Sequence, residues 1–273
     1  MISGFHVLLI IHHALYLPQK VISEMVDVPL MIQIKDVWKS FDDNHVLRGV
    51  NLDVQCGDTM VVMGRSGCGK SILLKMIVGL MKPDAGEIWV DGKEITKLKE
   101  KGIDEVRKNI GMLFQSAALF DSMNVFENVA FMLIQHTHLS KEEIRDTVAE
   151  KLRLVELPGT EELKPAELSG GMRKRVGLAR ALAINPDIVL YDEPTTGLDP
   201  ITAEEINILI RNLSTKLKIT SIVVTHDMKS AFSIATRMAM MHQGKIITTG
   251  TPEEIRQIKE PIVRNFISGT PER

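Results

Sequence analysis

Cysteine, aromatic residues and surplus charge are all scarce in this chain of 273 residues, and each scarcity excludes a class of protein. The two cysteines, Cys56 and Cys68, are too few for a disulfide scaffold, which fits a reducing compartment. Aromatic residues make up 4% of the chain, which argues against a surface that stacks on bases. The formal net charge of −2 gives no support for nucleic-acid binding through overall positive charge, so no nucleic-acid partner is expected.

Long apolar runs are missing as well. Residues 5–17, FHVLLIIHHALYL, are apolar, but they are broken by His12 and His13 and are shorter than a membrane span. No lysine or arginine precedes them, so the positive flank of a secretory signal is absent. Three interpretations stay open: a peripheral apolar helix, a weak signal, or sequence upstream of the true start. We hypothesise that translation begins at Met25 or nearby, which the intact mass of the protein from its native host would test.

From residue 31 onward the pattern is one of short strands, followed by alternating strands and helices. The stretch GEIWVDGKEI (86–95) alternates around Asp91-Gly92, a dipeptide that favours a tight hairpin. Together with residues 31–54 it predicts a small antiparallel β layer near the N-terminus.

Continuous apolar runs farther along the chain are typical of parallel strands covered on both faces. They lie at 58–64 (DTMVVMG), 187–191 (DIVLY) and 219–225 (ITSIVVT). Residues 201–217 have helical spacing after the start signal Asp199-Pro200. Residues 116–185, approximately, look helical throughout. The expected fold class is therefore α/β, with an N-terminal antiparallel β layer and an inserted helical lobe at about 116–185.

Residues 64–71, GRSGCGKS, match the phosphate-binding loop pattern in full. They follow an apolar strand and precede a helix-like stretch, which is the required context. Glycines let backbone N–H groups point at phosphate oxygens, and the helix N-terminus adds its dipole. Lys70 is expected to reach the β- and γ-phosphates, and Ser71 to ligate Mg²⁺. The predicted nucleotide-binding residues of this loop are Gly64, Arg65, Ser66, Gly67, Cys68, Gly69, Lys70 and Ser71, with Cys68 present as a small residue without redox function.

Two carboxylates end the run IVLYDE (188–193). In an open α/β sheet, ligands bind at the carboxyl ends of the strands. Beside a phosphate loop, Asp192 is predicted to hold Mg²⁺, and Glu193 to orient or deprotonate an attacking water. His226, after the strand VVT, and Gln115, after GMLF, are unremarkable by themselves, although an imidazole at that edge is able to donate to the γ-phosphate.

Taken together, GRSGCGKS, Gln115, LSGGM, IVLYDE, TTGLD and His226 occur in the order and approximate spacing of ATP-binding cassette (ABC) ATPases. The chain resembles this family over about residues 31–258, leaving 1–30 as an N-terminal extension and 259–273 as a short C-terminal tail. The resemblance implies a P-loop NTPase core that binds ATP and Mg²⁺ and hydrolyses ATP to ADP and phosphate.

The resemblance also implies residue roles. Phe41 takes the position of the ring that stacks on adenine, although Trp38 is close by and either ring fits. Gln115 lies in the Q-loop, as a ligand of Mg²⁺ and a link to the membrane partner, and His226 is the switch histidine. The implied catalytic residues are Glu193, His226, Gln115 and Lys70, and the implied Mg²⁺ ligands are Ser71, Gln115 and Asp192.

A second set of residues is implied to act between two copies of the chain. Ser169, Gly170 and Gly171 stand at the mouth of a helix, which is an anion site. In the family this motif faces the ATP held on the phosphate loop of a second copy, and Asp199 belongs to the D-loop at the same interface. The first partner expected is therefore a second copy, in an ATP-sandwich dimer.

Longer stretches of the sequence resemble one subfamily of these ATPases in particular. The stretches LFQSAALFDSMNVFENVAF, ELSGGMRKRVGLARAL and DEPTTGLDPITA are similar to the ATPases of Mla/Mce-type systems, which move phospholipids or other lipids. Met172 stands where many ABC ATPases have glutamine, and IVRNFISG (262–269) also resembles that group. The implied partners are multi-span permease subunits and an Mce-domain protein. The implied location is the cytoplasmic face of the inner membrane, peripheral through the permease.

Two surfaces carry weaker expectations. The lobe segment 116–130 offers an apolar cluster for a permease helix, with core packing as the alternative: Leu119, Phe120, Met123, Val125 and Phe126. The basic residues 173–175 and 180 are expected to form a solvated helix face. The competing functions are import of a small solute and, in a different class, a soluble ABC protein acting on ribosomes or DNA. The single cassette argues against the second of these.

Overall fold

The computed structural model describes residues 28–270. The apolar segment 5–17 and the hypothesised start at Met25 lie outside the described residues. Within residues 28–270, no helix combines the length and the apolar character needed to cross a membrane.

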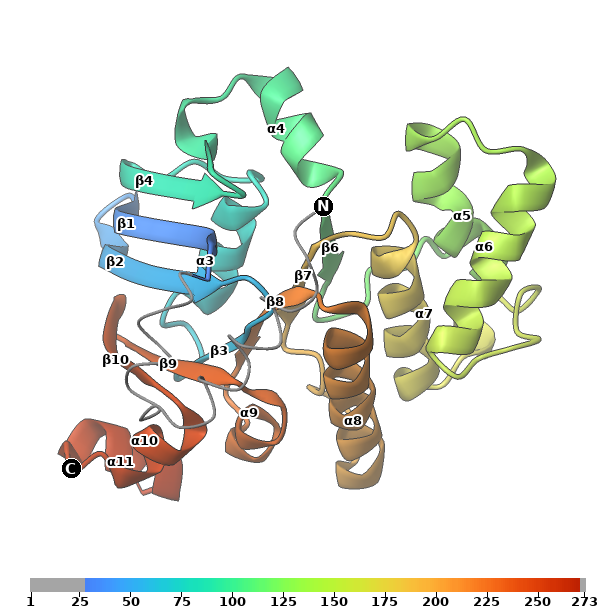
Figure 1. Cartoon of the computed structure of the whole chain (residues 1–273). Coiled ribbons are helices and arrows are strands. Elements are labelled where there is room, and N and C mark those ends of the chain that lie inside the picture. Colours follow the sequence, from blue (N-terminus) through green and yellow to red (C-terminus); the bar gives the residue numbers. More distant parts are fainter. Residues whose placement is uncertain (1–27, 271–273) are drawn as a thin grey trace, which may run out of the picture.

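A four-stranded antiparallel sheet forms the N-terminal layer (Figure 1). Its strands are β1 (Leu30–Phe41), β2 (Asn44–Gln55), β4 (Ala85–Val90) and β5 (Lys93–Glu94), in the order β2-β1-β4-β5. The predicted hairpin is confirmed: Val90 pairs with Lys93, and the turn residues Asp91 and Gly92 have φ of 48° and 69°. Positive φ at both turn residues is what a type I′ turn requires, and an Asp-Gly pair supplies it.

A six-stranded sheet forms the centre of the fold. It contains β10 (Lys245–Gly250), β9 (Arg237–His242), β3 (Thr59–Met63), β8 (Thr220–Thr225), β7 (Ile188–Asp192) and β6 (Ile110–Leu113), in that spatial order. β9, β3, β8, β7 and β6 run parallel, and β10 pairs antiparallel with β9. All residues of β3, β7 and β8 are buried, which confirms the three predicted apolar strands.

Helices lie on both sides of this sheet (Figure 1). The helices are α3 (Lys70–Ile77), α4 (Glu100–Arg107), α5 (Val125–His136), α6 (Lys141–Leu154), α7 (Gly170–Leu182), α8 (Pro200–Leu217), α9 (Met228–Ile234), α10 (Pro252–Gln257) and α11 (Pro261–Ser268), with 3-10 turns η1 (Ile95–Lys97) and η2 (Pro165–Glu167). α8 confirms the helix predicted over 201–217.

The expectation that residues 116–185 are helical throughout is wrong. Residues 114–124, 137–140 and 155–164 are turns and irregular backbone that flank and separate the helices α5, α6 and α7, and the 3-10 turn η2 precedes α7. Asn124 and Ser140 each start a helix with a capping box, which fixes where the irregular segments end. Ala117 and Ala118 have φ of 61° and 47°, so the chain cannot be α-helical there.

The core consists of two apolar clusters on opposite faces of the central sheet. Neighbouring residues of one strand point to opposite clusters: Val61 belongs to the cluster with the helical lobe, and Val62 to the cluster with the antiparallel sheet and α3. Val263 of α11 is buried in the lobe-side cluster, so α11 packs on the core. Burial on both faces explains why these strands are apolar at every position.

Candidate active site

A cavity of about 430 Å³ lies where the parallel strands end. Because carboxyl ends of parallel strands share one edge of a sheet, the segments after β3, β6, β7 and β8 meet there. The predicted residues that line the cavity are Phe41, Ser66, Gly67, Gly69, Lys70, Ser71, Gln115, Glu193 and His226. Val46 and Ile72 also line it and were missed, since ordinary apolar residues carry no motif signal.

The phosphate loop connects β3 to α3. Gly69 caps α3 with φ of 108°, a conformation that L side chains rarely adopt. A Cβ at Gly64 would collide with the carbonyl oxygen of Met241 and lie 2.9 Å from Cys68 Sγ, so the loop packs too closely for any side chain there. No side chain makes a cap hydrogen bond at the start of α3, so the first backbone N–H groups of this helix suit an anion.

Lys70 is buried in this loop. Its ammonium donates to the carbonyl oxygens of Gly64 (2.8 Å) and Arg65 (3.1 Å). Its Nζ also lies 3.6 Å from Oε1 of Glu193, an ion pair rather than a hydrogen bond. The positive charge therefore stands between the phosphate loop and the acid that ends β7. Burial raises the pKa of the neighbouring Cys68 thiol, and the Lys70 charge partly opposes this.

Ser71 and Asp192 form a pair of oxygen ligands. The Ser71 hydroxyl donates to Oδ1 of Asp192 at 2.7 Å. Among the described residues no three His, Cys, Asp or Glu side chains gather as a metal site. Mg²⁺ does not need such a cluster, because it is held by one or two carboxylates together with substrate phosphates and water. This hydroxyl and carboxylate are hard donors that fit Mg²⁺ bound with a nucleotide.

Glu193 is held at several points. Its φ is 49°, and its N–H donates to the carbonyl oxygen of Val224 at 3.0 Å. Its Oε2 lies 2.9 Å from Nδ1 of His226 and accepts from Thr196 Oγ1 (3.1 Å) and Thr225 Oγ1 (3.3 Å). An ionised carboxylate only accepts, so Nδ1 carries the proton in that pair. The imidazole, half exposed, then presents Nε2 as its other ring nitrogen.

The two threonines were not predicted as site residues, although both lie inside the quoted motifs. Thr196 belongs to TTGLD, and Thr225 precedes His226 in VVTHD. Threonine beside a motif carries no signal of its own, because exposed loops are rich in it.

The expectation that residues 173–175 and 180 of α7 form a solvated face is wrong for Lys174, whereas Arg173 is exposed. Lys174 is only 5% exposed, and its Nζ donates to the carbonyl oxygens of Gln115 (2.6 Å) and Glu193 (3.1 Å). Burial lowers the pKa of Lys174 to about 8, and the charges of Asp192 and Glu193 partly oppose the shift. The lysine faces inward because it satisfies loop carbonyls that lack a strand or helix partner.

Arg180 lies farther along α7, and its side chain contacts the same loop after β6. Its guanidinium donates to the carbonyl oxygens of Ala117 and Ala118, both at 2.7 Å. A Cβ at Gly177 would lie 2.8 Å from Leu113 Cδ1, so α7 is in close contact with β6 and the loop that follows it. Arg175 instead reaches the surface acids Glu156 (2.7 Å) and Glu205 (3.2 Å).

Eight predicted residues do not line the cavity. Gly64, Arg65, Cys68 and Asp192 belong to segments whose other residues line it, whereas Ser169, Gly170, Gly171 and Asp199 lie elsewhere. Ser169 is exposed and caps α7, its Oγ accepting from the N–H of Met172 at 3.2 Å. A Cβ at Gly170 would lie 3.1 Å from Leu198, so the motif sits beside the start of α8.

Asp199 caps α8 by accepting from the N–H groups of Ile201 (3.0 Å) and Thr202 (3.1 Å). Hydrogen bonds from Thr202, first its hydroxyl at 2.6 Å, lower the pKa of Asp199. Ser169–Gly171, which we call the signature motif, and Asp199 therefore lie side by side at the starts of α7 and α8, and none of them lines the cavity.

Of the two rings considered for adenine stacking, Phe41 lines the cavity and Trp38 does not. The Trp38 indole N–H donates to Asp36 at 2.8 Å on the antiparallel sheet. In the proposed docking cluster, Val125 is fully buried in the core and unable to contact a partner. Phe120 is exposed, with its ring centroid 5.1 Å from that of Phe131.

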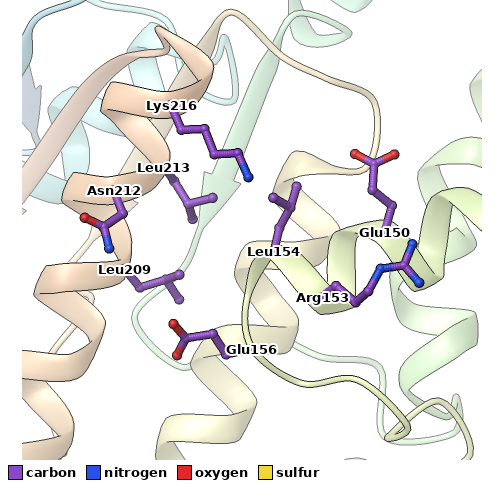
Figure 2. A pocket seen from close by; sticks show the side chains of 8 residues that line it. All are labelled: Glu150, Arg153, Leu154, Glu156, Leu209, Asn212, Leu213 and Lys216. Atoms are coloured by element: carbon purple, nitrogen blue, oxygen red, sulfur yellow. The ribbon is translucent and has the colours of Figure 1, made fainter.

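A second cavity, of about 500 Å³, lies between α6 and α8 (Figure 2). Leucines from both helices form its apolar part, and charged side chains such as Glu150, Arg153 and Lys216 stand around them. None of its lining residues belongs to a motif quoted above, so the chemistry is assigned to the cavity at the phosphate loop.

A phosphate loop with its lysine, a serine–aspartate pair for a divalent cation and a glutamate–histidine pair around one cavity define a P-loop nucleoside triphosphatase. The family model "ABC transporter" matches residues 47–196, more than half of the chain. The chain belongs to the ABC transporter family, and the expected P-loop NTPase fold of an ABC ATPase is confirmed.

Two similar proteins indicate the subgroup of this family to which the chain belongs. The chain is 44% identical to "Intermembrane phospholipid transport system ATP-binding protein MlaF" of Haemophilus influenzae, over 88% of this chain and 90% of that protein. It is 42% identical to "Probable ribonucleotide transport ATP-binding protein mkl" of Mycobacterium leprae, over 87% of this chain and 69% of that protein. These relatives confirm an ABC ATPase of the Mla type.

Among solved structures, the fold resembles the dimeric, post-hydrolysis state of the ATP-binding cassette MJ0796 bound to ADP and Pi. The TM-score is 0.76 at 35% identity, covering 81% of this chain and 99% of that one. The predicted activity, hydrolysis of ATP, is confirmed by this family membership.

Proposed function

We propose that this chain drives phospholipid transport as the ATP-hydrolysing subunit of an Mla-type ABC system, working as a pair of identical cassettes. The observation that carries the enzymatic part is the convergence of Lys70, Ser71–Asp192 and Glu193–His226 on one cavity. The relative in Haemophilus influenzae, named for intermembrane phospholipid transport and matched over 90% of its length, supports the transported class.

ATP binding falls to the phosphate loop and Phe41. The N–H groups at the start of α3 donate to the phosphate oxygens, and Lys70 turns from its loop carbonyls to the β- and γ-oxygens. Phe41, which also lines the cavity, stacks on the adenine. Ser71, Asp192 and Gln115 hold Mg²⁺, which neutralises charge on the phosphates when bound.

Hydrolysis then depends on Glu193. Its carboxylate orients a water in line with the γ-phosphate and takes the proton that the water loses. The left-handed backbone and the bonds from His226, Thr196 and Thr225 keep that carboxylate at the cavity. When both of its ring nitrogens carry a proton, His226 donates from Nε2 toward the γ-phosphate while Nδ1 keeps its 2.9 Å contact with Glu193.

The second copy completes the site. Ser169, Gly170 and Gly171 lie on a surface outside their own cavity, together with Asp199. A helix N-terminus capped by an exposed serine is suited to bind a phosphate. In the pair, this surface of one copy covers the γ-phosphate on the phosphate loop of the other. The dimeric MJ0796 cassette supports the arrangement.

The transport path belongs to partner subunits. The proposed partners are a multi-span permease and an Mce-domain protein, with the cassette held at the cytoplasmic face of the inner membrane by the permease. The exposed Phe120, beside the Q-loop, is the apolar contact offered to a permease helix.

Purification of the tagged chain from membranes of its native host tests the transport proposal. Co-purification of a permease and an Mce-domain protein, with phospholipid identified by mass spectrometry, is the expected result. Recovery of a solute-binding protein without lipid would overturn it in favour of a small-solute importer. ATPase assays of the same complex, with Glu193→Gln beside the wild type, test the enzymatic part separately.

A further inference from the structure

We propose that Lys174 is a positioning residue that links the signature helix α7 to both Gln115 and Glu193. The inference rests on the roles proposed above for those two residues. It concerns how the Q-loop and the catalytic carboxylate are held at fixed positions relative to each other, and how closure of the dimer reaches them.

The contacts come from three different parts of the chain. Lys174 donates to the carbonyl oxygen of Gln115, 59 residues away, at 2.6 Å, and to that of Glu193, 19 residues away, at 3.1 Å. Gln115 follows β6 and Glu193 follows β7, two neighbouring strands of the sheet. One ammonium group thus joins the ends of two strands to a helix.

Burying a lysine side chain costs free energy. A buried ammonium loses its hydration, and an apolar side chain of similar volume would fill the same space without that loss. The observed side chain is compensated only by the two carbonyls and the nearby acids Asp192 and Glu193. The lysine at position 174 therefore serves to hold the backbone of Gln115 and Glu193 and does not only fill space in the core.

The two segments that Lys174 holds have strained backbone conformations. Glu193, Ala117 and Ala118 all have left-handed backbone, which is rare for residues other than glycine. Arg180 of the same helix holds the carbonyls of Ala117 and Ala118. α7 therefore holds the Q-loop at three carbonyls, and through Lys174 it holds Glu193 as well.

The location of Lys174 near the start of α7 explains how contact with the second copy reaches Gln115 and Glu193. The helix starts at Ser169–Gly171, the motif proposed to contact the ATP of the second copy, and Lys174 lies within its first two turns. A shift of α7 when that contact forms moves the backbone of Gln115 and Glu193 together. Lys174 should thus matter for turnover and little for ATP binding by the single chain.

Three variants of the full chain separate this role from simple stability. Lys174→Met fills the same space without a donor, and Lys174→Gln keeps a donor one bond shorter. Lys151→Met is the matched control: Lys151 is 3% exposed and also bonded, to Asn185 at 2.6 Å, but it lies on α6 away from the cavity. Each is measured for ATP affinity, for kcat, and for hydrogen exchange without nucleotide.

Lys174→Met is expected to bind ATP with nearly unchanged affinity and to lose on the order of tenfold to a hundredfold in kcat, the scale of a misplaced catalytic group. Exchange should quicken at residues 115–118 and 193–196. Lys174→Gln should recover part of kcat. Lys151→Met should keep kcat while its thermal stability falls.

Wild-type kcat in Lys174→Met, or unchanged exchange in both segments, would overturn the linkage. An equal loss of kcat in Lys151→Met would reduce it to a stability effect and overturn it too. Glu193→Gln, assayed alongside, keeps the two proposals apart. If that variant loses turnover while Lys174→Met does not, the linkage fails and the role of Glu193 stands.

Discussion

Ser71 and Asp192 are joined by a 2.7 Å hydrogen bond although 121 residues separate them in the chain. Ser71 lies at the start of α3, directly after the phosphate loop, and Asp192 ends β7. β8 lies between β3 and β7 in the sheet, and all three run parallel, so their carboxyl ends share one edge. The hydroxyl and the carboxylate form a ready pair of ligands for a divalent cation.

Asp192→Asn removes the negative oxygen from this pair. We expect a lower rate of ATP hydrolysis and a Mg²⁺ requirement shifted to higher concentration, because a carbonyl oxygen is the weaker ligand. A titration of ATPase activity against MgCl₂ at fixed ATP measures the shift, with nucleotide binding in EDTA as the control. An unchanged Mg²⁺ dependence would contradict the role of Asp192.

Glu193→Gln keeps the shape of the side chain and removes its basicity. Turnover should fall about 10²- to 10⁴-fold, the usual contribution of a general base. ATP binding should persist, and a stable ATP-bound dimer should accumulate, visible by light scattering. Near-normal turnover would remove Glu193 from its role.

Ser169→Arg should leave ATP binding by the single chain intact and abolish hydrolysis, since the arginine blocks the surface offered to a second copy. Lys70→Ala should weaken binding or turnover at the chain's own phosphate loop. An equal mixture of the two variants should regain activity that neither has alone, because one intact loop then faces one intact signature motif. No recovery in the mixture, with dimers present, would argue that each chain forms its site alone.

Cys68, inside the phosphate loop, should react slowly with alkylating reagents. Burial raises the pKa of its thiol, so less thiolate is present at a given pH and the rate keeps rising to higher pH than for an ordinary thiol. ATP should protect it further. The Cys56→Ser variant isolates Cys68, since these are the two cysteines of the chain. The exposed Cys56, isolated by Cys68→Ser, is the reference. Equal rates for both thiols would contradict the prediction.

Gly177→Ala tests how tightly α7 contacts the Q-loop. The added Cβ would lie 2.8 Å from Leu113 Cδ1 and 3.2 Å from the Cβ of Ala117, and such overpacking costs about 1–3 kcal/mol. Gly102→Ala, within helix α4, meets only the Leu98 side chain, at 3.3 Å from Cδ2 and 3.4 Å from Cβ, and should gain about 0.5–1 kcal/mol from helix propensity. Urea unfolding measures both. A Gly177→Ala variant as stable as Gly102→Ala would show that α7 is not tightly packed against Leu113 and Ala117.

Much of the fold was predictable because its local signals are strong. The strands β3, β7 and β8, the Asp-Gly hairpin and α8 follow from apolar runs, turn chemistry and a start signal. The helical lobe was placed, but its irregular segments were missed, since residues 114–124 keep a helix-compatible composition while their carbonyls are held by side chains of α7. Local propensity cannot register such contacts.

The amino-acid sequence by itself determined the chemistry: a phosphate loop after a buried strand, two acids ending another, and a histidine ending a third. Those patterns are local, and the rule that parallel strands share an edge brings them together. Only the tertiary structure decided that Thr196 and Thr225 hold Glu193, and that Lys174 of α7 turns inward. Lys174 looks like a solvated lysine in any local pattern. It is buried because it donates to two loop carbonyls that only the folded chain brings within reach.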